Sequence, residues 1–312
     1  MPQKPIDPIS PPPLRPGDSI GIIAPGSPLD KSKFFNGIST LDQMGFRPIF
    51  SEELFSANGY LAGPDILRAN LLSAAFLDKE IKAVWCGRGG YGSLRILKYI
   101  DFKLIQAHPK IFIGSSDISV LLNTLYFKSG LVTFHGPMIE SLGNADKLTL
   151  KSIRDIFFLT DHMLTVNPGK SIVIHPGRAT GIVSGGNLAT ICHLVGTPFQ
   201  PNYSGHILLL EDIGEAPYRI DRMLTQMKMA QCFDGISGLI LGSFEKSGEI
   251  DHIYNIFYDI FRDIDIPILA GFDIGHGYPN ITIPFGIKAL LDTDAGVLVY
   301  QHQHLNPATS LK

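Results

Sequence analysis

The sequence has few cysteines, one tryptophan, no long apolar run and no surplus of basic residues. Its three cysteines, Cys86, Cys192 and Cys232, are widely spaced and lie among apolar neighbours. A sparse, odd number at this spacing predicts buried reduced thiols and offers neither a disulfide framework nor a zinc site. This cysteine usage favours a reducing compartment, so we expect a cytoplasmic protein.

Two further shortages argue against whole classes of partner. No apolar run approaches the roughly 20 residues that span a bilayer, and the proline-rich residues 1–17 lack the apolar stretch of a secretory signal. The formal net charge is −3 without a basic stripe, which argues against nucleic acid or an anionic membrane as the main partner. What is present is a chain of 312 residues, 45% hydrophobic and 18% charged. This is the composition of a globular protein with one large or two smaller domains.

Short apolar runs alternate with segments of helical periodicity along most of the chain. This alternation predicts an α/β fold in which a parallel sheet carries helices on both faces. We expect four consecutive parts: a proline-rich arm at 1–17, an N-terminal domain at 18–143, a crossover linker at 144–180 and a C-terminal domain at 181–312.

The stretch 111–127 begins with an apolar run, turns sharply and continues at helical spacing. A strand, a tight turn and a helix with Ser116 at the apex form the pattern of a nucleophile elbow. Gly114 leaves room for the turn, and the backbone N–H of Asp117 can serve as an oxyanion donor. The other interpretation is an ordinary helix cap, because Ser-Asp is also common before helices.

A second turn, the glycine-rich stretch 87–92, follows the apolar run 83–86. It has neither the register of a dinucleotide-binding fingerprint nor the Lys-Ser/Thr of a phosphate-binding loop, which argues against a nucleotide cofactor. Glycines in such a turn also allow backbone N–H groups to approach a reacting oxygen. Because both turns follow strands, we expect them at one edge of the sheet, although this one can also be a plain strand-to-helix turn.

The second half offers two polar residues at predicted strand ends, Glu211 and His276, the latter between two glycines. A serine, a histidine and a carboxylate are the components of a catalytic triad, namely the nucleophile, the general base and the group that orients the base. Chemistry alone favours Ser116, His276 and Glu211 for these roles.

Other groupings stay open on the residues alone. Nearby carboxylates could lie on the solvated surface or replace the chosen one; they are Asp212, Glu215 and Asp221. His135, beside Gly136 and Pro137, is the main rival base. A metal site could use His135, Glu140, Glu211 and His276, but their spacing matches no metal-binding motif, so we expect no metal.

Several motifs, taken together and in order, resemble the LD-carboxypeptidase (murein tetrapeptide carboxypeptidase) family from about Leu14 to Tyr300. The motifs are Leu61–Gly63 with Arg68, Arg88–Gly92, Gly114–Asp117, His135–Pro137, Gly185–Asn187, Gly196–Pro198, Glu211-Asp212, Tyr218–Arg222 and Gly275–Gly277. Many motifs in one order are far more specific than any one of them.

The resemblance implies a serine carboxypeptidase of peptidoglycan recycling that removes the terminal D-alanine from an L,D-linked murein tetrapeptide, without a cofactor. It implies that Ser116 is the nucleophile, His276 the base and Glu211 the orienting carboxylate. The oxyanion hole would consist of the backbone N–H groups of Gly90 and Asp117.

The same resemblance implies a two-domain α/β architecture with the site at the domain interface. The N-terminal parallel-sheet domain would resemble class I glutamine amidotransferases, and the C-terminal domain would be a β-rich α/β domain. The substrate would be a small peptide or muropeptide, and the protein would form a homodimer. Arg88 is a candidate for binding the terminal carboxylate of the substrate. Ser115 stands where the family more often has an aromatic residue, which places two serines side by side.

Two alternative functions share this fold. A microcin-C-type self-immunity peptidase would use the same triad to cleave an aminoacyl-nucleotide-like toxin. The resemblance to such peptidases would imply an inserted aromatic loop. Here the single tryptophan, Trp85, lies in a predicted buried strand and the 160–180 crossover is short, which favours a cell-wall substrate. A non-catalytic binding protein of the same fold would not need Ser116, Glu211 and His276 together.

Overall fold

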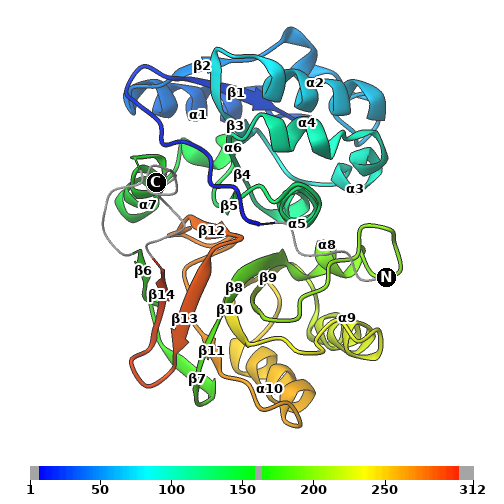
Figure 1. Ribbon diagram of the computed structural model, residues 1–312, viewed down its shortest axis with the longest axis vertical. Coiled ribbons are helices and arrows are strands. Elements are labelled where there is room, and N and C mark those ends of the chain that lie inside the picture. The colour runs from blue at the N-terminus through cyan, green and yellow to red at the C-terminus, as the bar shows by residue number, and fades with distance from the viewer. Residues whose placement is uncertain (1–6, 159–163, 302–312) are drawn as a thin grey trace.

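The computed structural model describes residues 7–158 and 164–301, which form two sheets (Figure 1). The first sheet has the strand order β12-β5-β4-β3-β1-β2, and the second has the order β6-β14-β13-β8-β9-β10-β11-β7. Figure 1 shows the first sheet and its helices in the upper part of the view and the second sheet below them.

The first sheet is parallel except at one edge. Its strands are β1 (Ser19–Ile23), β2 (Arg47–Ile49), β3 (Ile81–Cys86), β4 (Ile111–Gly114), β5 (Thr133–His135) and β12 (Ile283–Phe285). Strands β1 to β5 pair in parallel, as the alternation of strands and helices predicts, and β12 pairs antiparallel with β5. Every residue of β1 and β4 is buried, as expected for a parallel sheet that is covered on both faces.

Seven helices and three short 3-10 turns accompany this sheet within residues 7–158. The helices are α1 (Lys31–Gln43), α2 (Asp65–Leu77), α3 (Ser93–Ile96), α4 (Phe102–Ala107), α5 (Ser119–Ser129), α6 (Ile139–Leu142) and α7 (Lys147–Phe158). The 3-10 turns are η1 (Glu52–Phe55), η2 (Leu97–Tyr99) and η3 (Ser116–Ile118).

The second sheet has a parallel centre and antiparallel flanks. Its strands are β6 (Thr165–Val166), β7 (Ile172–His175), β8 (Arg178–Asn187), β9 (His206–Ile213), β10 (Gly238–Glu245), β11 (Ile268–Ala270), β13 (Lys288–Asp292) and β14 (Val297–Tyr300). Strands β8 to β11 pair in parallel, and β7, β13, β14 and β6 add antiparallel pairs at the two sides. The helices of this half are α8 (Leu188–Cys192), α9 (Pro217–Met229) and α10 (Ile250–Phe261). The predicted β-rich α/β half is confirmed.

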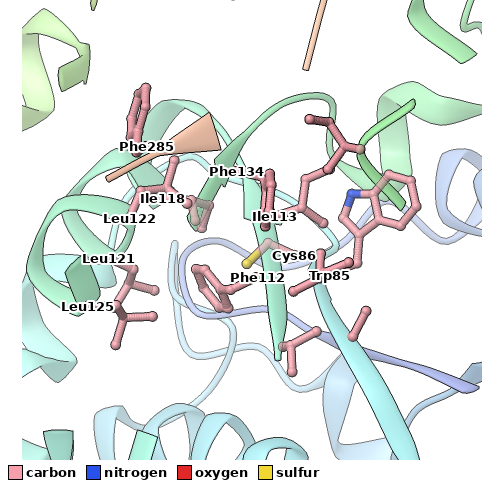
Figure 2. Packing of buried hydrophobic residues seen from close by; sticks show 14 of the residues in the cluster. Trp85, Cys86, Phe112, Ile113, Ile118, Leu121, Leu122, Leu125, Phe134 and Phe285 are labelled. Carbon is pink, nitrogen blue, oxygen red and sulfur yellow. The ribbon is translucent and has the colours of Figure 1, made fainter. Parts of the chain in front are cut away.

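Helix α5 joins the two halves through its packing. It is buried on nearly every side because it contacts β4 and β5 of the first sheet as well as β8 and α8 of the second half. Figure 2 shows labelled core side chains of β3, β4 and β5 together with Leu121, Leu122 and Leu125 of α5 and with Phe285 of β12. The turn that precedes α5 therefore lies at the boundary between the halves.

Two segments do not follow the predicted division of the chain at residues 143 and 180. Strand β12 belongs by sequence to the C-terminal part but pairs with β5 in the first sheet. The stretch 144–180, expected as a linker, holds α7 and also β6 and β7, which pair with β14 and β11 of the second sheet. The domain boundaries themselves stay a prediction.

The first six residues of the proline-rich arm fall outside the described part of the chain. The rest of the arm lies against the first domain. Ile9 forms a β-bridge with Leu131, and its N–H donates to the carbonyl of Gly130 at 2.8 Å. Leu14 is buried, and its N–H donates to the carbonyl of Phe157 at 2.7 Å. The arm thus packs on the surface from residue 9 onward.

The cysteines behave as the sequence predicts, since Cys86, Cys192 and Cys232 are free and buried. Among the helices of 7–158 and 164–301, none is both long and apolar enough to cross a bilayer. The same ranges contain no group of three or more His, Cys, Asp or Glu side chains that could hold a metal ion.

Candidate active site

Ser116 stands at the apex of the turn between β4 and α5, in the left-handed region at φ 59°. A non-glycine residue there stores roughly 1–3 kcal/mol of strain, which surrounding structure must hold in place. Gly89 packs closely against Ser116, because a Cβ on Gly89 would lie only 3.0 Å from the Ser116 Cβ. Ser116 lines a cavity, whereas the neighbouring Ser115 is buried and does not.

The glycine-rich turn 87–92 lies beside this serine and is tied to the loop after β1. The N–H of Ser27 donates to the carbonyl of Gly89 at 2.9 Å, and the Ser27 hydroxyl accepts from the N–H of Tyr91 at 3.1 Å. Gly90 has φ +86°, and a Cβ there would collide with the Ser27 hydroxyl. This turn therefore needs glycine, as the sequence suggests for a backbone that approaches a reacting atom closely.

Gly90 and Asp117 line the same cavity as Ser116. Within the described parts of the chain, no hydrogen bond uses the backbone N–H of either residue. Two free N–H groups beside a nucleophile are what an oxyanion hole requires. The Asp117 side chain points elsewhere, because its carboxylate accepts from the N–H of Ser93 at 2.8 Å. Burial raises the pKa of Asp117, and the hydrogen bonds from Ser93 offset part of this effect.

Glu211 and His276 form a close pair in the second half. The His276 Nδ1 lies 2.7 Å from the Glu211 Oε2, and Glu211 is fully buried near the end of β9. Burial raises the pKa of Glu211, but the neighbouring His276 and His135 outweigh it and hold the pKa at about 2. Burial lowers the pKa of His276, but the charge and hydrogen bond of Glu211 outweigh it, so this pKa lies above its ordinary value. The carboxylate thus holds the ring through Nδ1, the arrangement in which the Nε2 of a triad histidine can act as a base.

The loop that carries His276 is held by its backbone. The Ser243 hydroxyl, on β10, accepts from the N–H of His276 at 3.1 Å and from that of Gly277 at 3.2 Å. The N–H of Gly275 donates to the Asn280 side chain at 3.1 Å. Gly275 has φ +129°, and a Cβ there would lie 2.6 Å from the Glu211 Oε2. Only glycine fits between the histidine loop and the carboxylate.

Hydrogen bonds across the boundary dock the second half against the elbow. The Thr190 hydroxyl, on α8, lies 3.3 Å from the carbonyl of Ser116, and the N–H of Asn187 donates to the Ser119 hydroxyl at 3.0 Å. The contacts among residues 7–158 and 164–301 do not include a hydrogen bond between Ser116 and His276. Catalytic hydrogen bonds are often longer in an unliganded enzyme and shorten when substrate binds.

The cavity at Ser116 has a volume of about 230 Å³, and its wall is formed by both halves of the chain. Its polar lining from the second half includes Asn187, Asp212 and Glu215. Burial and the nearby Glu211 raise the pKa of Asp212 to about 6, against the hydrogen bonds from Ile213, Ala189 and Asn187. Glu215 also lines this cavity, and its carboxylate lies 3.5 Å from the Arg219 Nη1.

A second cavity of about 610 Å³ adjoins the first between α8 and α9. The two share Ala189, His193 and Glu215, and the second adds the side chains of Tyr218, Arg219 and Arg222. A ligand that reaches Ser116 can therefore extend over the surface of the second half.

Both halves of the chain match models of one protein family. The model for the LD-carboxypeptidase N-terminal domain matches residues 20–136, and that for the C-terminal domain matches residues 180–291. The probable murein peptide carboxypeptidase of Bacillus subtilis is 39% identical over 291 residues, which cover 90% of each chain. The chain belongs to the LD-carboxypeptidase family. It is thus an enzyme of a peptidase family, as the motifs predicted.

Solved structures agree with this membership. The muramoyltetrapeptide carboxypeptidase from Oxalobacter formigenes matches with a TM-score of 0.80 and 30% identity, over 90% of this chain and 97% of that one. The microcin C7 self-immunity protein in complex with aspartyl sulfamoyl adenosine matches with a TM-score of 0.89 and 27% identity, over 96% and 100%. Both branches of the LD-carboxypeptidase family that the sequence suggests therefore share this fold.

Arg88 and His135 do not line the Ser116 cavity of this LD-carboxypeptidase-family protein, and neither do Glu211 and His276. Arg88 is exposed, donates to the carbonyl of Pro28 at 2.9 Å and lies 3.8 Å from Glu140. Its role in binding the substrate carboxylate stays a prediction. His135, the rival base, is fully buried with its Nε2 at 3.7 Å from the Glu211 Oε1.

Sequence reasoning gave no role to several residues that line the cavities, notably Asn187, Thr190 and His193. Asn187 is part of a quoted family motif, so a signal was present for it. Thr190 lies on the short helix α8 and His193 directly follows this helix, and neither has a local pattern that sets it apart from other surface residues.

Proposed function

We propose that this protein is a serine carboxypeptidase that removes the terminal D-alanine from an L,D-linked murein tetrapeptide, with Ser116, His276 and Glu211 as its triad. The observation that carries the proposal is the pair of His276 and the buried Glu211, 2.7 Å apart, in a chain whose Ser116 stands in a strained turn at a cavity. Family membership and relatives named as murein peptide carboxypeptidases support the same chemistry.

The reaction begins when the Ser116 hydroxyl attacks the carbonyl carbon of the L-residue, while His276 Nε2 takes the hydroxyl proton. The backbone N–H groups of Gly90 and Asp117 stabilise the oxyanion that forms. The bond to nitrogen then breaks, and His276 returns the proton to the amine of the leaving D-alanine. Water repeats the sequence on the acyl-enzyme and restores the Ser116 hydroxyl, with Glu211 balancing the charge of the imidazolium throughout.

The charge of the cavity supports a diamino acid, lysine or diaminopimelate, as the L-residue. Glu215 lines the cavity together with Ser116; its side chain is 26% exposed, and its carboxylate lies 3.5 Å from the exposed Arg219 guanidinium. A free side-chain amino group of the substrate can pair with this carboxylate, whereas an acidic side chain would be repelled by it.

The test is release of D-alanine from UDP-MurNAc-tetrapeptide. Ser116→Ala is expected to abolish release because it removes the attacking oxygen, while Ser115→Ala, its adjacent control, retains most turnover. Normal turnover by Ser116→Ala would contradict the proposed nucleophile. The same protein should be tested on a processed microcin, since the similarity to the microcin C7 self-immunity protein favours that alternative substrate. Hydrolysis of the microcin without release of D-alanine would decide for the alternative.

A further inference from the structure

His135 is a buried histidine whose two ring nitrogens have no hydrogen-bond partner in the described part of the chain. It ends β5, between β4 and β12, and has no exposed surface. Neither of its ring nitrogens makes a hydrogen bond with any residue that the structure describes. Buried polar groups are almost always hydrogen-bonded, so this one needs a reason.

The surroundings of His135 point to Glu211. Its Nε2 lies 3.7 Å from the Glu211 Oε1, which is likewise buried and unpartnered within the described chain, while Oε2 accepts from His276. Glu211 thus lies between two imidazoles, one from each half of the chain. The Phe285 ring lies 5.7 Å from the His135 ring, and a Cβ on Gly186 would approach that ring to 3.4 Å. These neighbours keep the imidazole directed at the carboxylate.

We propose that His135 is a positioning residue, which donates from Nε2–H to the Glu211 Oε1 and so keeps the Glu211 Oε2 on His276 during the reaction. The inference rests on the proposed function, since it requires Glu211 to orient the base. The nitrogen and oxygen must approach from 3.7 Å to roughly 3.2 Å or less to form this hydrogen bond. His135 lies on the nucleophile side of the boundary, so the contact also couples docking of the two halves to the orientation of the triad.

The chemical need arises when His276 becomes protonated. A carboxylate held through one oxygen can rotate, and rotation would take the Oε2 away from the imidazolium. A second donor on Oε1 prevents this and shares the negative charge. The charged groups that face His276 are Glu211, Asp212 and Glu245. Without His135, the Glu211 charge acts more fully on His276, so His276 holds its proton to higher pH.

The experiment compares three variants. His135→Leu removes the donor, His135→Gln keeps an N–H near the position of Nε2, and Thr282→Val is the control. The Thr282 hydroxyl is also buried and unpartnered among the described residues, and it lies beside Gly136 rather than Glu211. Each variant is assayed for D-alanine release and for the rate at which a fluorophosphonate labels Ser116 across pH, with thermal unfolding as the check on folding.

His135→Leu should lower kcat about tenfold, the loss expected for one hydrogen bond to a charged group, with little change in KM. As the pH is lowered, its labelling rate should begin to fall at a higher pH than that of the unmodified protein. His135→Gln should restore most of kcat and the original pH dependence, and Thr282→Val should leave both unchanged. If folded His135→Leu keeps the original kcat and pH dependence, or if His135→Gln is equally impaired, His135 does not position Glu211. An unmodified protein that is not labelled at Ser116 refutes the proposed triad, and one that is labelled but releases no D-alanine refutes only the proposed substrate.

Discussion

Replacement of Gly275 by alanine is expected to damage the triad through a single methyl group. The new Cβ would lie 2.6 Å from the Glu211 Oε2 and 2.7 Å from the Ser243 hydroxyl. The first atom accepts the hydrogen bond from the His276 ring, and the second accepts from the His276 backbone N–H. One substitution therefore disturbs both supports of the histidine.

The size of the effect follows from these distances. To reach an ordinary contact at 3.4 Å, the Glu211 Oε2 must move by about 0.8 Å, which stretches its 2.7 Å bond to His276 beyond hydrogen-bonding range. A hydrogen bond to a charged partner is worth about 1.5–3 kcal/mol. Its loss corresponds to a fall in kcat of about 10- to 150-fold. Backbone strain at φ +129° adds a loss of about 1–3 kcal/mol in the free energy of unfolding.

The assay is D-alanine release, with kcat and KM determined separately and stability measured by urea unfolding. Gly205→Ala is the matched control, because Gly205 also has a positive φ, +76°, but a Cβ there meets nothing within 4 Å. It should lose stability by backbone strain while kcat stays unchanged. A folded Gly275→Ala protein with kcat within twofold of the original would refute the reasoning.

Two further substitutions test charge in the site. Glu211→Gln removes the charge that raises the pKa of His276. Because the base works only when unprotonated, the acid limb of the pH profile of kcat/KM should move to lower pH, and kcat should fall. An acid limb that does not move would contradict the pairing of Glu211 with His276. Glu215→Gln should raise KM for a substrate with a free side-chain amino group by about two- to fivefold and leave kcat nearly unchanged, as for one exposed ion pair. The same substitution should not affect a substrate whose amino group is acetylated, and an equal effect on both substrates would exclude the proposed pairing.

The sequence predicts the elements of this fold well where a local pattern exists. The apolar run before Ser116 and the helical spacing after it are local patterns, so the elbow can be predicted without knowledge of the rest of the chain. The same holds for the antiparallel hairpin of β13 and β14, since the turn residues lie between two apolar runs.

Features that depend on distant contacts are not readable in this way. Glu211 is one of several carboxylates in its stretch; its place at a predicted strand end favours it over Glu215, and only the family resemblance assigns the orienting role to it and not to Asp212. The contact between His135 and Glu211 joins two strands that no local pattern brings together. Strand β12 has only three residues, and its pairing with β5 depends on the way the chain returns to the first sheet.

The pairing of β12 with β5 of the first sheet affects any attempt to separate the two halves of the chain. A fragment that ends near residue 143 would lack β12 and would expose β5 as a bare edge strand, with unpaired N–H and C=O groups beside the elbow. Bare edges invite pairing with other chains, so such a fragment should aggregate. The two halves are therefore suited to reconstitution from overlapping pieces only if the piece carrying Ser116 is supplied with the residues of β12.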